Sequence, residues 1–350
     1  MRVLLTGAAG FIGGAIADQL RAAGDEVVAV DCMLPAAHGS AAVPEGVHDL
    51  DVRQAADAEE WAALLDGIDV VCHQAAMVGA GVTPADLPAY AGHNDLGNAA
   101  LLAGMYAAGV SRFVFASSMV VYGEGRYACP THGVRVPQPR AVAALDAGDF
   151  DNHCDECGAV LAWESVAEET ELAPRSSYAA SKVAQEHYTL AWARQAGGAA
   201  IGLRYHNVYG PLMPKDTPYS GVAAIFRSSL ERGEAPQVFE DGAQMRDFVH
   251  VDDVARANVL ALRAVAEAPA ESYAAYNVAS GHPIAIREVA EMVGEGAGRP
   301  IPPEVTGQYR LGDVRHIVAS PERARTELGF TAEVTPDVGL PAFATAPLRS

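Results

Sequence analysis

Basic residues and long apolar runs are both scarce in this sequence. It has 24 Lys and Arg against 44 Asp and Glu, a formal net charge of −20 over 350 residues. Nucleic-acid binding depends on clustered cations that neutralise phosphates, so this balance argues against a nucleic-acid partner. We find no basic and apolar leader before the first expected strand, and no apolar run as long as a membrane span. We therefore expect a cytoplasmic protein that has no membrane partner.

Cysteine is also scarce, and three of the five cysteines lie in one segment. Cys129 and His132 are separated by two residues, and so are Cys154 and Cys157. This spacing is typical of the two knuckles of a tetrahedral structural zinc site. A disulfide, disfavoured in a reducing compartment, and unpaired surface thiols are the alternatives. His153, beside the second knuckle, is an alternative to His132 as a ligand.

A glycine-rich turn lies at the start of the chain. The apolar residues 2–6 predict a buried strand, which leads into Gly7, Gly10, Phe11, Ile12 and Gly13 and then into a helix-like run. Strand, glycine turn and helix form the context that a dinucleotide-binding fingerprint requires. The glycines allow a tight turn, so that a pyrophosphate can sit on the N-terminus of the helix.

Asp31 ends the second expected strand, where an acid should bind the adenosine ribose hydroxyls. Residues 32–35 contain no arginine or lysine. A 2′-phosphate would therefore meet a bare carboxylate, and the sequence favours NAD over NADP.

Tyr178 and Lys182 lie four residues apart on an expected helix and so share one face. An ammonium group beside a phenol favours the phenolate, which makes the tyrosine usable as a base near neutral pH. The pair predicts proton transfer at an active site.

Strand and helix patterns alternate up to residue 206, which predicts an α/β fold of the Rossmann type with a doubly wound parallel sheet. We expect a NAD-binding domain over 1–206, with an insertion at about 124–170, and a smaller α/β substrate domain over 207–350. The last five residues should form a loose tail. The expected strands are 2–6, 26–30, 69–73, 112–116 and 200–204, and the expected helices are 12–23, 57–65, 94–108 and 177–196.

Ordered motifs along nearly the whole chain resemble the extended short-chain dehydrogenase/reductase superfamily, the group of the nucleotide-sugar epimerases and dehydratases. Besides the glycine turn, Asp31 and the Tyr178/Lys182 pair, they are Asp51-Val52, His73-Gln74-Ala75-Ala76, Asn94, Phe115-Ala116-Ser117-Ser118, Val121-Tyr122-Gly123, Arg204-Tyr205-His206-Asn207-Val208-Tyr209-Gly210-Pro211 and Arg246-Asp247-Phe248-Val249-His250-Val251-Asp252-Asp253.

The resemblance implies roles for these residues. Tyr178 would exchange a proton with a sugar hydroxyl, Lys182 would also hold the nicotinamide ribose, and Ser118 would bond the reacting oxygen. His206, where relatives carry an aromatic residue, either lines the nicotinamide pocket or is a core histidine. The other cofactor-binding residues implied are Asp51, Val52, Ala75, Ala76, Asn94, Ser117, Tyr205 and Val208. The substrate-binding residues implied are Ser118, Met119, Asn207, Arg246, Arg310 and Asp313.

Subfamilies differ at the two residues after Ser118. Sugar-nucleotide dehydratases have an Asp-Glu pair there, whereas this chain has Met119-Val120, which cannot transfer protons. The resemblance therefore favours a NAD-dependent nucleotide-diphospho-sugar 4-epimerase, expected to be a homodimer. The insertion is similar to that of dTDP-rhamnose-type 4-epimerases, and we expect it to overhang the substrate mouth. A nucleotide-4-ketosugar reductase or dehydratase, and a non-catalytic NAD-sensing or interaction protein, are the alternatives.

Overall fold

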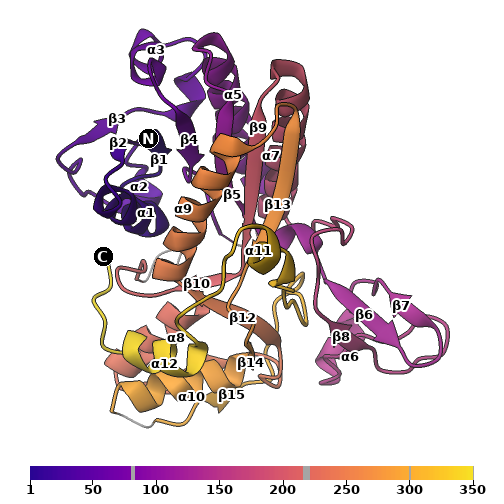
Figure 1. Cartoon of the computed structure of the whole chain (residues 1–350). Coiled ribbons are helices and arrows are strands. Elements are labelled where there is room, and N and C mark those ends of the chain that lie inside the picture. Colours follow the sequence, from indigo (N-terminus) through magenta and orange to yellow (C-terminus); the bar gives the residue numbers. More distant parts are fainter. Residues whose placement is uncertain (80–82, 216–220, 299–300, 350) are drawn as a thin grey trace.

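A central sheet of seven parallel strands organises the fold (Figure 1). The computed structural model describes residues 1–79, 83–215, 221–298 and 301–349. In sheet order the strands are β13 (Ser272–Val278), β9 (Ala199–Tyr205), β5 (Arg112–Ser118), β4 (Val70–His73), β1 (Arg2–Thr6), β2 (Glu26–Asp31) and β3 (Val47–Asp49). The chain order reverses beside β1, which confirms the doubly wound Rossmann-type fold.

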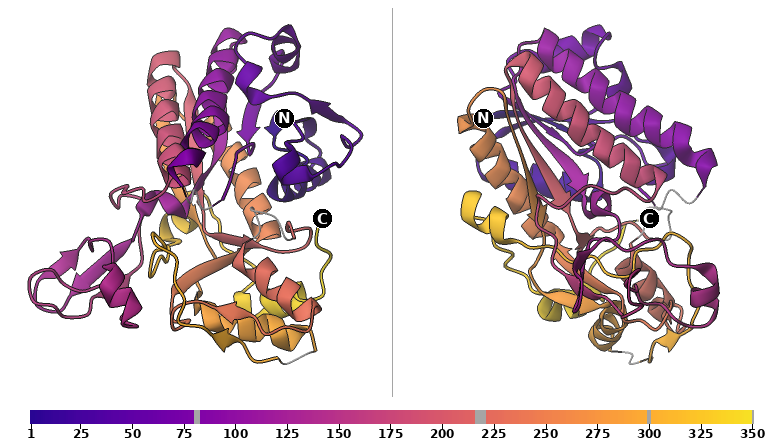
Figure 2. Two further views of the ribbon diagram at one scale, coloured as in Figure 1. Left: turned by 180° about the vertical axis from the view of Figure 1, so that it is seen from behind. Right: turned by 90° about the vertical axis from the view of Figure 1, so that its right-hand side faces the viewer.

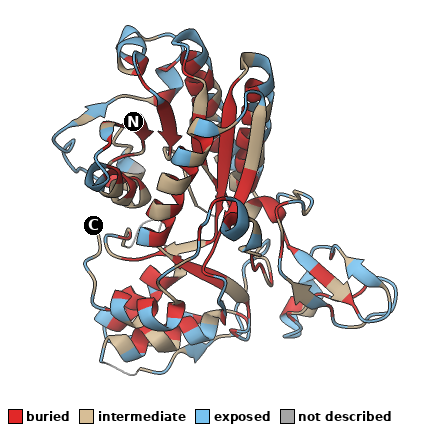
Figure 3. Ribbon diagram, viewed as in Figure 1, coloured by how far each residue is buried: buried red, intermediate tan, exposed pale blue. Residues whose placement is uncertain are grey.

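Helices cover both faces of this sheet, because each buried strand carries apolar side chains on both sides. Val3 and Leu5 pack toward one layer of helices and Leu4 toward the other. The first layer consists of α1 (Phe11–Ala22), α9 (Val251–Glu267) and α11 (Glu322–Glu327), and the second of α3 (Glu59–Leu65), α5 (Gly97–Ala107) and α7 (Ser177–Ala196). The right-hand view in Figure 2 shows the sheet between the two layers, and Figure 3 shows its buried strands.

Short helical turns follow several strand ends, where the cavity described below lies. They are α2 (Pro35–His38), η1 (Val52–Gln54), η2 (Pro84–Asp86), α4 (Leu87–Tyr90), the π-helical η3 (Ala91–Leu96) and η4 (Met119–Tyr122).

The expected domain division at residue 206 needs a correction. Strand β13 pairs with β9 along its whole length, from Ser272 opposite Ala199 to Val278 opposite Tyr205. Helix α9 packs against α1 and the sheet through residues such as Val254 and Leu262. The chain thus returns to the first sheet after residue 206, because β9 would otherwise be an uncovered edge.

The second, smaller part of the molecule lies below the ends of the central strands in Figure 1. Its own apolar core includes Phe226, Phe248, Val289 and Phe343. Its strands are β10 (Asn207–Tyr209), β11 (Gln237–Val238), β12 (Met245–His250), β14 (Pro283–Ala285) and β15 (Glu304–Val305), and its helices are α8 (Val222–Glu231), α10 (Ile286–Gly296) and α12 (Pro336–Phe343).

The insertion forms a small subdomain that projects from the body (Figure 1). Its antiparallel sheet has the order β7-β6-β8. The elements are β6 (Arg126–Cys129), β7 (Gly133–Arg135), α6 (Val142–Asp146) and β8 (Ala162–Glu164).

The C-terminal residues depart from the expected loose tail. Leu212 donates a hydrogen bond to the carbonyl of Pro347, and the main chains of Met213 and Arg349 are hydrogen-bonded. The tail is thereby fixed near α1, and Ser350 lies outside the described residues. Within the described part of the chain, no helix combines the length and apolarity needed to cross a membrane.

Candidate active site

A cavity of about 380 Å³ lies at the carboxyl ends of the central strands and reaches into the second part of the molecule. Most of the predicted cofactor residues line it, although they come from distant parts of the sequence. Those residues are Gly7, Gly10, Phe11, Ile12, Gly13, Asp31, Asp51, Val52, Ala75, Ala76, Ser117, Tyr178, Lys182, Tyr205 and Val208.

The glycine turn between β1 and α1 fits a pyrophosphate. Gly7 has φ of 69°, and a Cβ placed there would lie 2.6 Å from the amide nitrogen of Ala75. A Cβ at Gly13 would lie 2.0 Å from the carbonyl oxygen of Gly7, so larger residues would separate the helix from the turn. Helix α1 begins after Gly10 without a side-chain cap or an acid in its first turn. Its N-terminal amide groups are therefore suited to an anion.

Asp31 lies at the other end of the expected cofactor site and is fixed by the backbone. Its carboxylate accepts hydrogen bonds from the amides of Ala9 (3.1 Å) and Met33 (3.0 Å). His38 Nε2 lies 3.4 Å from Asp31 Oδ1. Arg349 also lines this cavity and donates to the carbonyls of Ala9 and of Ala37. Sequence reasoning missed His38 and Arg349 because neither belongs to a motif.

Ser118, Tyr178 and Lys182 meet where β5 ends beside the first turn of α7. Ser176 caps this helix by accepting a hydrogen bond from Ala179 N (3.1 Å), which fixes the start of the helix close to Tyr178. Tyr178 is hydrogen-bonded to Ser118. Lys182 Nζ donates to the carbonyl of Ala116 (2.8 Å) and lies 5.9 Å from the centroid of the Tyr178 ring.

The pKa values of this pair differ from the sequence expectation. Burial raises the pKa of Tyr178 to about 12, although its hydrogen bond with Ser118 acts in the opposite direction. Burial lowers the pKa of Lys182 to about 7, against the opposing charges of Glu186 and Asp95. Desolvation therefore outweighs the attraction between ammonium and phenolate in this state. Tyr178 is a neutral phenol at pH 7, and burial shifts Lys182 toward its neutral amine.

A buried polar network lies behind these residues. Ser117 Oγ donates to Glu186 Oε1 (2.5 Å), and Glu186 forms an ion pair with Arg204 (2.7 Å). Arg204 also donates to the hydroxyl of Tyr122 (2.8 Å) and to the carbonyl of Glu168 (2.9 Å). The network connects α7 to β5 and β9, and it directs the Ser117 hydroxyl toward Glu186.

Two predicted cofactor residues do not line the cavity. Asn94 exchanges hydrogen bonds with the backbone of Met77 (2.8 and 2.9 Å) and donates to Ser181 (2.9 Å), so it supports the loop after β4. His206 is 4% exposed, and its two ring nitrogens have no hydrogen-bond partner among the described residues. Burial and the charge of Arg246 lower the pKa of His206 to about 3, so the ring is neutral.

The second part of the molecule contributes the opposite wall of the cavity. Asn207, a predicted substrate-binding residue, lines it. Its side-chain amide donates to the carbonyl of Asp247 (3.0 Å) and lies 3.7 Å from the sulfur of Met119. Phe248 and the start of α8, Gly221 and Val222, also line it. Sequence reasoning missed Gly221 and Val222 because helix α8 has no motif that marks its first turn. Phe248 belongs to a quoted motif but was assigned no role in the site.

The predicted substrate arginines lie outside the lining of this cavity. Arg246 donates to the backbone carbonyls of Val314 (2.6 Å) and Arg315 (3.0 Å). Arg310 is exposed, pairs with Asp313 (2.9 Å) and lies 5.6 Å over the ring of Phe239.

Ser118 and Met119 are not lining residues, but each contacts one: Ser118 is hydrogen-bonded to Tyr178, and the sulfur of Met119 lies 3.7 Å from the Asn207 amide. Residues 124–170 contribute nothing to the described lining. The insertion is therefore not part of the wall of this cavity, and the expected overhang of the substrate mouth stays a prediction.

The structure brings the four predicted metal ligands together in the insertion. The ligand atoms of Cys129, His132, Cys154 and Cys157 all lie within 4.8 Å of one another. The Sγ atoms of Cys129 and Cys157 are 3.7 Å apart, and His132 Nδ1 lies 3.6 Å from Cys129 Sγ and 3.4 Å from Cys154 Sγ. A tetrahedron with Zn–S of about 2.3 Å and Zn–N of about 2.0 Å has edges of about 3.8 and 3.5 Å.

The surroundings of this cluster also suit a metal. Cys154 is a free thiol. Burial acts to raise its pKa, but backbone amides of Glu156 and Cys157 and the ring of His132 lower it to about 6. His153, the alternative ligand, is turned toward Asp149 (2.9 Å) instead.

Known proteins resemble this chain over nearly its whole length. A family model described as "NAD dependent epimerase/dehydratase family" matches residues 3–140 and 156–279, and the gap between these ranges falls inside the insertion. The dTDP-L-rhamnose 4-epimerase of Burkholderia thailandensis is 32% identical over 346 residues, which cover 97% of this chain and 93% of that protein.

Two solved structures of related proteins resemble this structure over nearly the whole chain. UDP-glucose 4-epimerase from Thermotoga maritima, solved with UDP-glucose, has a TM-score of 0.77 and 28% identity, over 98% of this chain and 97% of that one. The Thermus thermophilus UDP-glucose 4-epimerase, solved with NAD, has a TM-score of 0.74 and 30% identity, over 98% of each chain. The present chain belongs to the NAD-dependent epimerase/dehydratase family.

Proposed function

We propose that this protein is a NAD-dependent nucleotide-diphospho-sugar 4-epimerase. The observation that supports this function best is the continuity of one cavity. It runs from the glycine turn at Gly7, past Tyr178 and Lys182, to Asn207 and Phe248 in the second part of the molecule. A dinucleotide and a sugar nucleotide that enter from the two ends would meet beside the proton-transfer pair.

Tyr178 accepts the proton of the sugar C4 hydroxyl and later returns it, while Ser118 orients the reacting oxygen. NAD, held by the glycine turn and Asp31, would supply a hydride acceptor and donor for C4 and the positive charge of its oxidised ring. A cation in this half of the cavity lowers the pKa of Tyr178 from the value of about 12 that burial imposes. Lys182 holds its place through the carbonyl of Ala116 and adds to this effect when protonated.

Met119 supports epimerisation over dehydration. It follows Ser118 directly, and its sulfur lies 3.7 Å from the Asn207 amide, on the side from which the sugar would enter. A thioether exchanges no proton with C5 or C6, so the chemistry stays at C4.

The reductase and the non-catalytic NAD sensor, the two alternatives, each differ from an epimerase in one requirement. A ketosugar reductase consumes reduced cofactor in every turnover, and a non-catalytic NAD sensor does not need the Ser118, Tyr178 and Lys182 set that this site retains.

Hydrogen tracing tests the function. A substrate deuterated at C4 should give a C4-epimeric product that keeps the label, without solvent deuterium at C3, C5 or C6. Loss of the C4 label to water, or an absolute need for added reduced cofactor, would refute the proposal. Running the assay with UDP- and dTDP-hexoses selects the substrate. dTDP-rhamnose is the first choice because the dTDP-L-rhamnose 4-epimerase is 32% identical over 97% of this chain.

We also propose that the Cys129, His132, Cys154 and Cys157 cluster binds one structural zinc ion. The spacing between the ligand atoms supports this, and four protein ligands leave no open position for a reacting oxygen. Thiols held ready for a metal fit a reducing compartment such as the cytoplasm.

A homodimer is proposed through the outer faces of α5 and α7. These helices expose Tyr106 (68%) and Tyr188 (50%) around an apolar groove that Leu102 and Trp192 also line. Large exposed aromatic residues beside a groove are typical of an interface.

A further inference from the structure

Residues 314–316, called here the anchor segment, fix the position of Arg246. The Arg246 guanidinium donates to the carbonyls of Val314 (2.6 Å), Arg315 (3.0 Å) and Met245 (2.9 Å). Two of these acceptors belong to the anchor segment. The direction of the guanidinium therefore depends on where that segment lies.

The insertion contacts the anchor segment through three side chains. Glu124 accepts a hydrogen bond from the amide of Arg315 (3.2 Å), and Tyr127 and Asp151 supply the other two contacts. The hydroxyl of Tyr127, a fully buried residue, accepts a hydrogen bond from the amide of His316 (3.0 Å) and donates to its carbonyl (3.4 Å). Asp151 accepts a hydrogen bond from Arg315 Nε (3.0 Å).

The contacts made by Tyr127 and Asp151 each lie beside one of the two ligand pairs. Tyr127 is on β6, which ends at Cys129, and Asp151 shortly precedes Cys154. A metal that joins Cys129 to Cys154 therefore fixes the spacing between these two groups.

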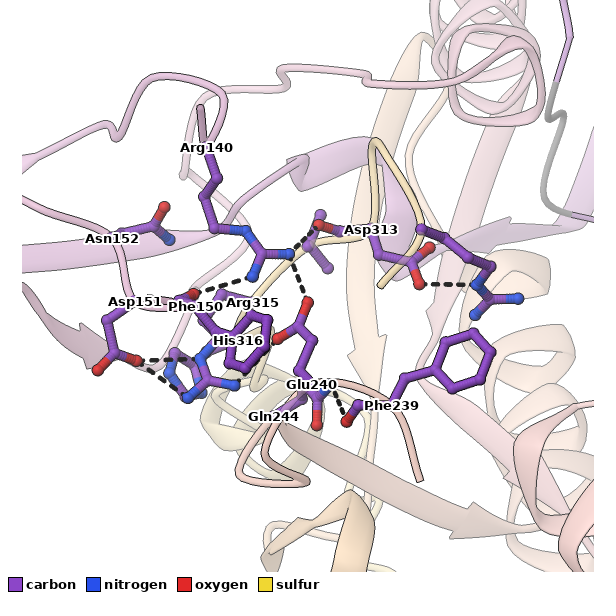
Figure 4. A network of polar contacts seen from close by, with 12 residues as sticks. Arg140, Phe150, Asp151, Asn152, Phe239, Glu240, Gln244, Asp313, Arg315 and His316 are labelled. Carbon is purple, nitrogen blue, oxygen red and sulfur yellow. Dashed lines mark hydrogen bonds and ion pairs between the residues drawn. The ribbon is translucent and has the colours of Figure 1, made fainter. Parts of the chain in front are cut away.

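Buried charges make the connection between the insertion and the second part of the molecule rigid (Figure 4). The side chains of Arg315 (3% exposed) and Arg140 (5% exposed) converge on Glu240 (2% exposed), at 3.0 and 2.8 Å. Arg140 also donates to the carbonyl of Asp313 (2.7 Å), and Arg315 to the carboxylate of Asp241 (2.6 Å). Displacing one member would leave charges buried without partners, so the arrangement resists small shifts.

We propose that the zinc cluster is a positioning element that sets the affinity for the nucleotide sugar by fixing the anchor segment and, through it, Arg246. This inference rests on the proposed nucleotide-sugar function and assigns Arg246 to the diphosphate. NAD binding is independent of the cluster, because the described residues of the insertion do not line the cofactor cavity.

Tyr127→Phe and Asp151→Ala each remove one of the two contacts beside the ligand pairs without changing a metal ligand. Glu164→Gln is the matched control, since Glu164 lies on β8 of the same small sheet and pairs with the exposed Arg126 (2.7 Å). UDP and dTDP serve as probes, with dissociation constants measured by calorimetry on full-length protein. The same titrations are run on zinc-stripped wild-type protein. The NAD and zinc contents of every sample are measured in parallel.

We expect the dissociation constant of the nucleoside diphosphate to rise at least about fivefold in both contact variants and in the zinc-stripped protein. KM should rise in the variants with little change in kcat. The contact variants should keep the NAD and zinc contents of wild type. The Glu164→Gln protein should also keep the wild-type dissociation constant.

Unchanged affinity in both contact variants would overturn the inference, even if C4 epimerisation is intact. Absence of any UDP or dTDP binding by wild type would overturn the proposed function together with it.

Discussion

Replacing Tyr178 with Phe tests the central chemical step. The change removes the hydroxyl and keeps the ring, which lies 5.8 Å from the ring of Tyr90. The hydrogen bond with Ser118 is lost, and a bond of this kind contributes about 1 kcal/mol to stability. The variant should therefore fold and keep its NAD. Turnover should fall by roughly 10²–10⁴, as expected for the loss of a general acid and base.

The structure also predicts how pH affects this step. With a pKa of about 12, ionising Tyr178 at pH 7 costs on the order of 7 kcal/mol before the cofactor's charge acts. The activity of wild type should therefore rise with pH as the phenol of the loaded enzyme ionises. The residual activity of Tyr178→Phe should lack this dependence.

Tyr90→Phe provides the matched control, since it removes the same kind of hydroxyl from a neighbouring ring. Its turnover should stay within about tenfold of wild type, because we assign Tyr90 no proton transfer. Steady-state kinetics across pH and the NAD content of each purified protein are the measurements. If Tyr178→Phe keeps more than a tenth of wild-type turnover, or if both variants lose the same amount, the assigned role is wrong.

Three further predictions concern other parts of the molecule. Elemental analysis should find about one zinc per chain, and Cys154→Ser should release it and expose residues 124–170 to proteolysis; a metal-free native protein with an ordered insertion would contradict this. His206→Phe should make the protein less sensitive to acid. Burial lowers the folded-state pKa of His206 to about 3, so below pH 6.5 the unfolded chain binds one proton more than the folded protein, and the free energy of unfolding falls as pH decreases. Denaturant titrations at pH 7 and pH 5 should show that His206→Phe loses about 2 kcal/mol less than wild type between these pH values. Arg349→Ala removes a cation that spans Ala9 and Ala37 beside Asp31, and it should weaken NAD retention during gel filtration; equal NAD content in wild type and variant would show that this contact is dispensable.

Local motifs predicted the half of the site that depends on short stretches of chain. The turn at Gly7, the acid at Asp31 and the pair Tyr178 and Lys182 each belong to a strand end or a single helical turn, so spacing alone places them. Each Cys/His knuckle is local for the same reason, and the structure brings the four predicted ligands of the zinc site together.

Features that depend on distant packing were not predictable from spacing. Arg349 reaches Ala9 only because the C-terminal residues pair with the backbone of Met213. The ionisation of Tyr178 depends on how much protein surrounds it, and a sequence motif does not report burial. His206 similarly fits the motif of a cofactor contact, but the fold buries it behind the cavity wall.

The return of β13 to the edge of the sheet has a consequence for synthesis on the ribosome. A nascent chain that ends near residue 206 contains most of the dinucleotide site, but it lacks α9, which covers Ile16 and Leu20 of α1, and the strand that pairs with β9. Such a fragment exposes apolar surface and an unpaired strand edge, both of which favour aggregation. The nascent protein therefore completes the sheet that carries the cofactor site only after residue 278 has left the exit tunnel.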